Sequence, residues 1–373
     1  MSGITRDIMD RRRFLKLVGA AAGAAAVGGL ASACGSPSAP APTAVPKAAE
    51  PTKAAAPATA QPTAAAAVAP GKAKVARLAF AHAGGGPSDK AANEFAKWMS
   101  ERTKGELTVQ IFPGGQLGGE RDMTESLQMG SIEIGLFGTY AMSNVTPEWG
   151  LVIDTPYVMR DQDHFRKVVD GPLCKPMYDA MLERKGIRHI AWTNRGPRYL
   201  TANKMIKTPE DLKGVKIRVP EVESYVAAWK MLGAIVTPMA FPEVFMALKQ
   251  GTIDAQENPF EQIYTSSLYE VQKYLMLTGH IRSGYEVTVS EKWLKSLSPE
   301  LQKTVTDGLL EFAKLHDKYQ AESESDLETK LKEKGMTFVE VDISKFQEAL
   351  KDLPKQFAGK WKPGFYEEVL AVK

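Results

Sequence analysis

The sequence has little of the material from which most catalytic and metal sites are built. Only two of its 373 residues are cysteines, Cys34 and Cys174, and its five histidines are spread along the chain without metal-ligand spacing. It has no G-x-S-x-G nucleophile motif, and its glycine runs at 84–86 and 114–119 lack the order of a nucleotide-binding loop. We therefore expect no enzyme, no metal and no cofactor. Two cysteines also exclude a disulfide framework.

A surplus of positive charge is missing from most of the chain. The formal net charge of +3 arises within the first 33 residues, which leaves the remainder formally neutral. A nucleic-acid-binding protein would keep a basic surplus in its folded part, so we expect no nucleic-acid partner. With 44% hydrophobic and 24% charged residues, the composition is that of a globular protein, and the length suffices for two domains. We expect a monomer.

The amino terminus has the pattern of a targeting segment. The sequence R-R-R-F-L-K at 11–16 precedes a short apolar run at 17–30 that is rich in alanine and glycine. A charged region, an apolar region and small residues before a cleavage site predict a signal peptide over 1–33 and an exported protein. The pattern resembles the twin-arginine signal, and an arginine-rich signal for the general secretory route is the alternative.

Cys34 follows the small residues L-A-S-A at 30–33, which resemble a bacterial lipobox. Cleavage after Ala33 at an A-x-A site, without a lipid, is the alternative. The residues from 36 to 70 include 15 alanines and eight prolines, which cannot bury enough surface to offset the entropy of ordering. We therefore predict that Cys34 is lipidated, that 34–71 is a disordered tether, and that the protein is held at the outer face of the cell membrane or in the periplasm. Cys174 is expected to be a small buried apolar residue.

The remaining sequence alternates between strand and helix patterns. Strands are predicted at 75–80, 107–112 and 132–137, with helices at 87–103 and 120–129. A second set of elements covers 187–192, 215–218, 222–232, 235–236, 242–249 and 253–254, and a long amphipathic helix runs from Pro299 to about Lys334. These patterns predict an α/β protein with mixed, mostly parallel sheets and a long bracing helix. We predict domain I over 72–195 plus about 284–320, and domain II over 196–283 plus about 321–373.

Four segments carry a resemblance to a known family. They are G-G-Q-L-G-G-E-R at 114–121, R-Y-L-T-A-N-K at 198–204, L-K-G-V-K-I-R-V-P at 212–220, and the stretch 238–259 that ends in Q-E-N-P. Together they resemble the substrate-binding subunit of tripartite ATP-independent periplasmic (TRAP) transporters, a family that includes dicarboxylate and sialic-acid receptors. The resemblance implies a two-domain clam-shell periplasmic binding protein fold, a small organic-acid ligand and a membrane permease as partner.

The same segments supply the candidate binding residues. Arg218 ends a predicted strand, where α/β sheets open on a ligand crevice, and a guanidinium matches a carboxylate through two parallel hydrogen bonds. The resemblance implies that Arg218 clamps the ligand carboxylate, that Arg198 and Asn258 lie near that group, and that Phe241 packs on the ligand. Tyr140, after the strand at 132–137, is a further candidate. So are His82, after the first strand, and Arg121, within the glycine-rich motif.

The identity of the ligand is the least determined part of the prediction. Side chains near the motifs that bind hydroxyl groups well favour a sugar acid such as a uronate; they are Asn194, Glu221, Gln256 and Glu257. A C4-dicarboxylate is the alternative, and its second carboxylate would need a second cation from Arg195 or Arg121. An exported enzyme that acts on a carboxylated substrate is a more distant alternative.

Overall fold

The structure is a computed structural model that describes residues 74–373. The predicted signal peptide at 1–33 and the predicted tether at 34–71, including Cys34, lie outside the described residues. Within 74–373, no helix combines the length and the apolar character needed to cross a membrane. In the same range, no three histidine, cysteine or acidic side chains come together as a metal site.

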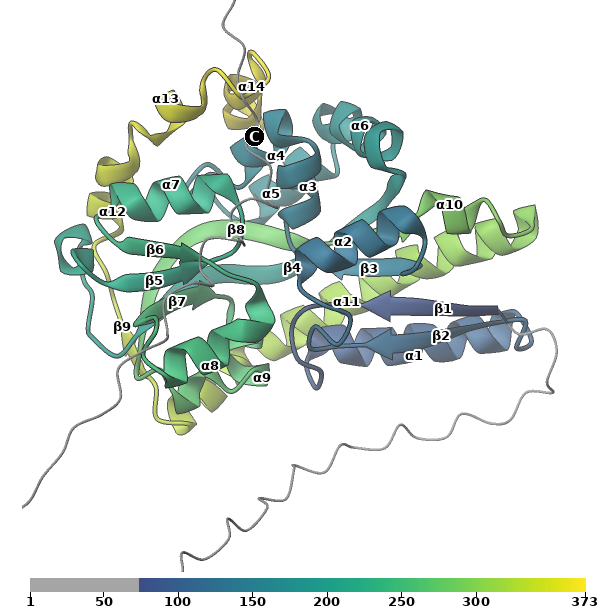
Figure 1. Ribbon diagram of the computed structural model, residues 1–373, viewed down its shortest axis with the longest axis horizontal. Helices are drawn as coiled ribbons and strands as arrows, with labels where there is room; N and C mark the ends of the chain where they lie inside the picture. Colours follow the sequence, from purple (N-terminus) through teal and green to yellow (C-terminus); the bar gives the residue numbers. More distant parts are fainter. Residues whose placement is uncertain (1–73) are drawn as a thin grey trace, which may run out of the picture. The chain divides into compact units, whose positions relative to one another are not determined.

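The described residues contain one mixed sheet of nine strands (Figure 1). The strands are β1 (Lys74–Ala79), β2 (Leu107–Phe112), β3 (Ile134–Phe137), β4 (Ile187–Ala202), β5 (Lys216–Val219), β6 (Ile235–Pro238), β7 (Ala255–Asn258), β8 (Tyr274–Ser290) and β9 (Thr337–Val339). Their order is β2-β1-β3-β8-β4-β7-β5-β6, and β9 pairs with β8.

The sheet has two parallel parts joined by two long antiparallel strands. β1, β2 and β3 pair in parallel and form the base of what we call the amino-terminal lobe. β5, β6 and β7 pair in parallel and form the base of the central lobe. β4 and β8 run antiparallel to each other; one end of the pair adjoins β3 and the other adjoins β7. This is the two-domain clam-shell arrangement that the sequence predicted, whereas the exact domain boundaries stay a prediction.

Helices cover both faces of the sheet. They are α1 (Pro87–Arg102), α2 (Glu120–Met129), α3 (Tyr140–Val145), α4 (Pro147–Ile153), α5 (Gln162–Val169), α6 (Lys175–Lys185), α7 (Glu223–Met231), α8 (Val244–Lys249), α9 (Phe260–Thr265), α10 (Glu291–Leu294), α11 (Pro299–Glu333), α12 (Ile343–Leu350), α13 (Leu353–Phe357) and α14 (Phe365–Ala371). In Figure 1, α2 to α7 lie above the central strands, and α1, α8, α9 and α11 lie below them.

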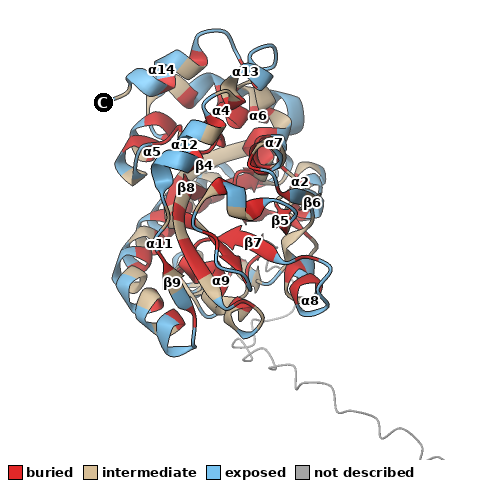
Figure 2. Cartoon of the chain, turned by 90° about the vertical axis from the view of Figure 1, so that its left-hand side faces the viewer, coloured by how far each residue is buried: buried red, intermediate tan, exposed pale blue. Residues whose placement is uncertain are grey.

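The long helix α11 braces both lobes. Ser298 caps its first turn by accepting from the backbone N–H of Leu301, and Pro299 fits the first helical position. Its first half packs against α1, where the ring centres of Phe312 and Phe95 lie 5.7 Å apart. Its second half buries Leu327 in the core of the central lobe. Figure 2 shows this helix with a buried inner face and an exposed outer face.

The structure corrects several predicted elements. β4 continues to Ala202, ten residues beyond the predicted strand end at 192, and the 17-residue strand β8 was not predicted at all. β7 lies at Ala255–Asn258 rather than at 253–254. By contrast, α2 and β2 have the predicted bounds, and Cys174 is fully buried, with the pKa of its thiol raised to about 12 by burial.

Candidate functional site

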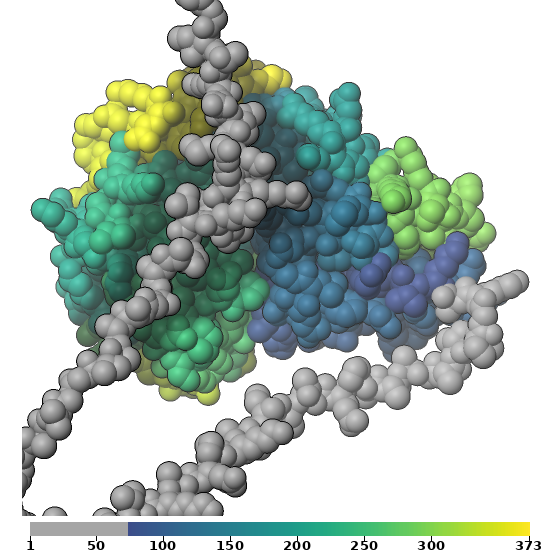
Figure 3. Space-filling view, viewed as in Figure 1, coloured from purple at the N-terminus to yellow at the C-terminus, as the bar shows by residue number. Residues whose placement is uncertain are grey.

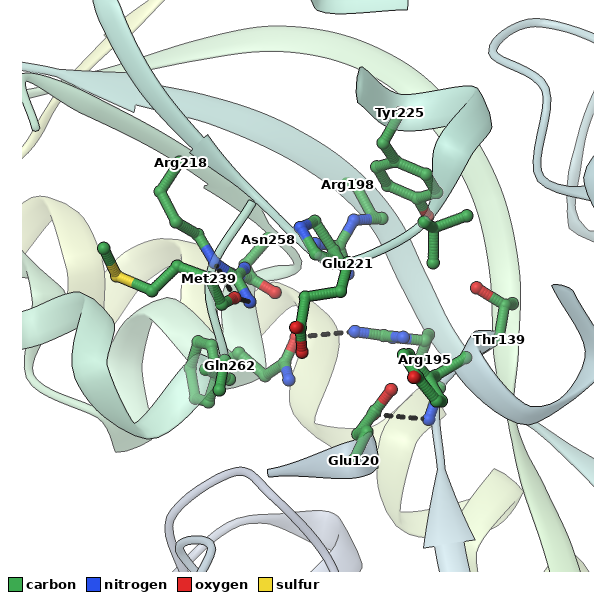
Figure 4. A pocket seen from close by; sticks show the side chains of 16 residues that line it. Glu120, Thr139, Arg195, Arg198, Arg218, Glu221, Tyr225, Met239, Asn258 and Gln262 are labelled. Atoms are coloured by element: carbon green, nitrogen blue, oxygen red, sulfur yellow. Dashed lines mark hydrogen bonds between the residues drawn. The ribbon is translucent and has the colours of Figure 1, made fainter. Parts of the chain in front are cut away.

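A cavity lies between the two lobes, and five of the seven predicted binding residues line it (Figure 4). Those five are Arg218, Arg198, Asn258, Phe241 and Tyr140. Arg218 comes from β5 and Asn258 from the end of β7, while Tyr140 begins α3 just after β3. The cavity therefore lies at the carboxyl ends of parallel strands from both lobes, where open α/β sheets bind ligands.

Arg218 is a buried cation without a carboxylate partner among residues 74–373. Its side chain is only 3% exposed, and its Nε and Nη2 atoms both donate to the backbone oxygen of Met239, at 2.9 and 2.7 Å. Burial lowers the pKa of Arg218 to about 10, because more distant carboxylates such as Glu257 offset the loss of water only in part. The Met239 carbonyl orients the guanidinium but leaves its charge uncompensated.

Arg198 lies beside Arg218 in a different electrostatic state. Its Nε and Nη2 atoms donate to the two carboxylate oxygens of Glu257 at 2.5 and 2.7 Å, and His280 Nε2 lies 3.0 Å from the same carboxylate. Burial alone would raise the pKa of Glu257, but the charge and hydrogen bonds of Arg198 lower it to about 2. The charge of Arg198 is thus compensated within the protein.

Asn258 is oriented by a chain of buried polar side chains. Its Nδ2 donates to Gln256 Oε1 at 2.5 Å, and Gln256 Nε2 donates to Thr201 Oγ1 at 2.8 Å. Phe241 also lies near Arg218, with its ring centre 5.7 Å from the guanidinium carbon. These neighbours fix the positions of groups around the Arg218 guanidinium, as a preorganised anion site requires.

Two predicted binding residues do not line this cavity. His82 is 2% exposed, stacks on Tyr285 with ring centres 4.7 Å apart, and has its Nε2 3.8 Å from a carboxylate oxygen of Glu261. Burial lowers the pKa of His82 well below its usual value. Arg121 points to solvent, with 61% of its side chain exposed, and pairs with Glu125. His82 follows a strand and Arg121 lies in a motif, but these positions in the sequence do not determine whether a side chain points into the cavity.

The cavity also contains polar residues that were not among the seven predicted sites. Arg195, Gln262, Glu120, Thr139, Glu221 and Tyr225 all line it. Of the four hydroxyl partners considered from the sequence, only Glu221 is among the lining residues. Glu120 was detectable in principle, because it is the first residue of a helix that follows the glycine-rich motif. Arg195 was named from the sequence only as a possible partner for the second carboxylate of a diacid, and Gln262 was not named.

The glycine-rich motif forms a close contact between the lobes. A Cβ on Gly119 would lie 3.0 Å from the Cβ of Ala240, and a Cβ on Gly115 would overlap the ring of Pro242. Asn144 of the amino-terminal lobe also donates to the backbone oxygen of Glu221, at 3.4 Å. In the space-filling view, the blue segments of the amino-terminal lobe meet the green segments of the central lobe (Figure 3). Small residues here permit the lobes to approach.

Two α/β lobes with a cavity between them, lined by buried arginines, indicate a solute-binding protein. The family described as bacterial extracellular solute-binding protein, family 7, matches residues 79–360. The chain belongs to this family and is the solute-binding receptor of a TRAP transporter, as the sequence motifs predicted. Its family identity makes it a transport receptor rather than an enzyme.

Three relatives illustrate the similarity. The solute-binding protein RD1_1052 of Roseobacter denitrificans is 37% identical over 262 residues, which are 70% of this chain and 80% of the relative. A crystal structure of RD1_1052 with bound L-galactonate has a TM-score of 0.76 and 32% identity, covering 81% of this chain and 99% of that one.

The 2,3-diketo-L-gulonate-binding periplasmic protein YiaO of Escherichia coli is 35% identical over 262 residues, which are 70% of this chain and 79% of the relative. A TRAP periplasmic solute-binding protein from Sulfurospirillum deleyianum with bound succinate has a TM-score of 0.76 and 29% identity, covering 80% of this chain and 99% of that one.

Proposed function

We propose that this TRAP receptor captures a sugar acid outside the cytoplasm, holds its carboxylate through Arg218 and delivers it to the membrane permease. The observation that carries the proposal is the buried Arg218 guanidinium, which has no carboxylate partner among the described residues. A ligand carboxylate would supply the missing charge and two parallel hydrogen bonds. Asn258 and Phe241 would complete the contacts around that carboxylate, and Arg198 would lie near it with its own charge compensated by Glu257.

Two features support a hydroxylated acid as the ligand. The structure of RD1_1052 contains L-galactonate, and YiaO is a 2,3-diketo-L-gulonate-binding protein; both acids carry several oxygen functions. The cavity wall of this chain includes the carboxylates of Glu120 and Glu221, which accept hydrogen bonds from hydroxyl groups and repel a second carboxylate. We therefore favour a sugar acid, an aldonate or a uronate.

A C4-dicarboxylate is the second candidate. Arg195 lies in the cavity and could pair with a second carboxylate, and one structural relative contains succinate. Calorimetric titration with galactonate, glucuronate, galacturonate, sialic acid, succinate and malate separates the two candidates. We expect tight binding of at least one sugar acid and weaker binding of succinate and malate. Tight binding of succinate with no response to any sugar acid would reverse the choice.

Substitution of Arg218 tests the clamp directly. Arg218→Ala and Arg218→Lys should weaken binding by roughly thirty-fold to several thousand-fold, since a desolvated charge pair left unmatched costs about 2–5 kcal/mol. Arg121→Ala is the matched control, because Arg121 is an exposed arginine outside the cavity. Unchanged affinity in the Arg218 variants would place the clamp elsewhere.

The match to a family of extracellular solute-binding proteins supports export, whereas the signal peptide and the lipid anchor rest on the amino-terminal sequence alone. A signal peptide over 1–33 would export the chain, and a lipid on Cys34 would anchor it, with 34–71 as the tether. Mass spectrometry of the mature protein should find a diacylglyceryl-modified Cys34 at the new amino terminus. A soluble product with a free Cys34 thiol would leave cleavage after Ala33 as the explanation.

A further inference from the structure

Arg195 is a second buried arginine of the cavity without a carboxylate partner in the described part of the chain. It lies in β4, is 4% exposed, and donates from Nη2 to Gln262 Oε1 at 2.6 Å. Its Nε has no acceptor among residues 74–373, nor has its Nη1, which lies beside Gly138, and its guanidinium carbon lies 4.5 Å from the ring centre of Tyr285. Buried donors normally have a partner, so this guanidinium has hydrogen-bonding capacity that the protein itself does not use.

Gly138 makes room for Arg195 and a neighbouring carboxylate. A Cβ on Gly138 would lie 2.9 Å from Arg195 Nη1 and 3.0 Å from Glu120 Oε1, so any larger residue would displace one of these groups. Glu120 is held in place because the same Oε1 accepts from the backbone N–H of Gly138 at 2.7 Å. Figure 4 shows Arg195 and Glu120 next to each other at the edge of the cavity. A strong donor and a strong acceptor thus share one wall.

This pairing of donor and acceptor matches a hydroxyl group. A hydroxyl both donates and accepts, so it can donate to Glu120 while it accepts from Arg195. An ionised carboxylate only accepts, and it would meet the negative charge of Glu120 beside the positive charge of Arg195. The wall is therefore better suited to a hydroxyl than to the second carboxylate of a diacid.

Arg195 and Arg218 enter the cavity from different sides (Figure 4). Arg218 belongs to β5 of the central lobe, whereas Arg195 lies in β4 close to residues of the amino-terminal lobe. We propose that Arg195, together with Glu120, binds a hydroxyl group at the end of the ligand remote from its carboxylate, and thereby selects long hydroxylated acids over short acids and diacids. This inference rests on the proposed function, in which Arg218 holds the carboxylate of a sugar acid.

The test compares two ligands of different length with an Arg195 variant. Galactonate has six carbons, and glycerate has the same acid end on three. Arg195→Met should weaken galactonate binding about 10- to 150-fold, the loss expected for a hydrogen bond from a charged donor. Glycerate, which lacks the remote hydroxyls, should lose less than about three-fold. Arg121→Met should bind both acids as the unmodified protein does, since Arg121 lies outside the cavity.

A purely structural role for Arg195 predicts a different result. If Arg195 only supports Gln262 and Tyr285, the variant should lose affinity for both acids by the same factor, and that outcome would overturn the proposal. The proposal would also be overturned if succinate bound more tightly than galactonate and Arg195→Met abolished the binding of succinate. That result would assign Arg195 to a second carboxylate.

Two further measurements can refute the proposal even if the Arg195 variant does not fold. If Arg195→Met does not fold, the unmodified protein titrated with glycerate, erythronate and galactonate provides the readout. Its affinity should rise with chain length, and equal affinities would refute the proposal. Binding of no sugar acid at all by the unmodified protein would refute the proposed function, whereas loss of binding in Arg218→Ala with no change in Arg195→Met would refute this inference alone.

Discussion

Two arginines that line one cavity differ in what holds them. Arg198 is bound to the carboxylate of Glu257, whereas Arg218 is bound only to a backbone carbonyl. In a buried site, this difference decides whether removal of the arginine leaves another charge without a partner. The two residues should therefore respond differently to the same substitution.

Arg198→Met should destabilise the ligand-free protein by about 3–5 kcal/mol, because it leaves the Glu257 carboxylate buried without its main partner. Urea unfolding measures this loss. The double variant Arg198→Met/Glu257→Gln should recover part of it, because the unpaired charge is then absent. Arg218→Met is the control and should cause little loss, since no carboxylate depends on Arg218. Equal destabilisation by both single variants would contradict this account.

Asp154 gives the stability a specific dependence on pH. It is fully buried, accepts from Ser143 Oγ at 2.5 Å, and has its pKa raised by burial from 3.8 to about 6. The folded state therefore binds the proton more tightly than the unfolded state, so this group's contribution is lost as the pH rises from about 4 to 6. The rise of the Asp154 pKa from 3.8 to about 6 corresponds to about 3 kcal/mol of stability.

Asp154→Asn should remove this part of the pH dependence. The free energy of unfolding, measured in urea at pH values from 4 to 7, should fall less between pH 4 and 6 in the variant than in the unmodified protein. Parallel pH profiles for the two proteins would show that Asp154 does not titrate in this range.

Sequence motifs located some cavity residues but missed others, for a physical reason. Arg218 lies near the end of a strand that was predicted, and the resemblance of the Q-E-N-P motif located Asn258 although its strand was misplaced. Arg195 in β4 and Gln262 in α9 are 67 residues apart in the sequence and meet in the cavity. Their contact depends on the packing of the two lobes, which local patterns do not encode.

At the scale of elements, the small residues of the loop at 114–119 determine how closely the two lobes can approach each other. Gly119 has φ −72°, which any residue adopts, so Gly119→Ala adds a methyl group without backbone strain. The added Cβ would lie 3.0 Å from Ala240 Cβ and oppose closure. Overpacking costs about 1–3 kcal/mol, so calorimetry should find galactonate affinity reduced roughly five- to 150-fold.

Ala240, the other residue of this contact, provides the control. Gly119→Ala also changes the first turn of α2, where glycine is a better cap than alanine. Ala240→Gly in the same chain removes the opposing methyl group and should restore affinity if contact between the lobes is the cause. An equally weak double variant would assign the loss to α2 instead.

Helices whose ends are marked by capping residues were predicted well, and strands without such residues at their ends were not. Gly119 caps the start of α2, and Gly130, which adopts the left-handed conformation, caps its end; Ser298 caps α11, which begins at Pro299. β4 instead continues through Gly196-Pro197, which usually ends a strand. β7 consists largely of polar residues whose partners lie on β4, so its sequence does not resemble a buried strand.

At the scale of the described chain, the lobes share structural elements. β4 and β8 belong to the sheet of both lobes, and α11 packs against α1 in one and α9 in the other. Disruption of either lobe would therefore expose core residues of the other. Shared strands and a shared helix couple the two halves while the cavity between them accepts a ligand.

This coupling predicts a single unfolding transition that responds as a whole to ligand. Differential scanning calorimetry of the protein should show one transition for the part of the chain described here, rather than one for each lobe. Galactonate at a hundred times its Kd adds about 2.7 kcal/mol, because only the folded state binds it, and should raise Tm by roughly 5 °C. Arg218→Ala should unfold in one transition that the same concentration of galactonate shifts by less than about 2 °C. Two transitions, of which galactonate shifts only one, would mean that each lobe unfolds alone despite the shared strands.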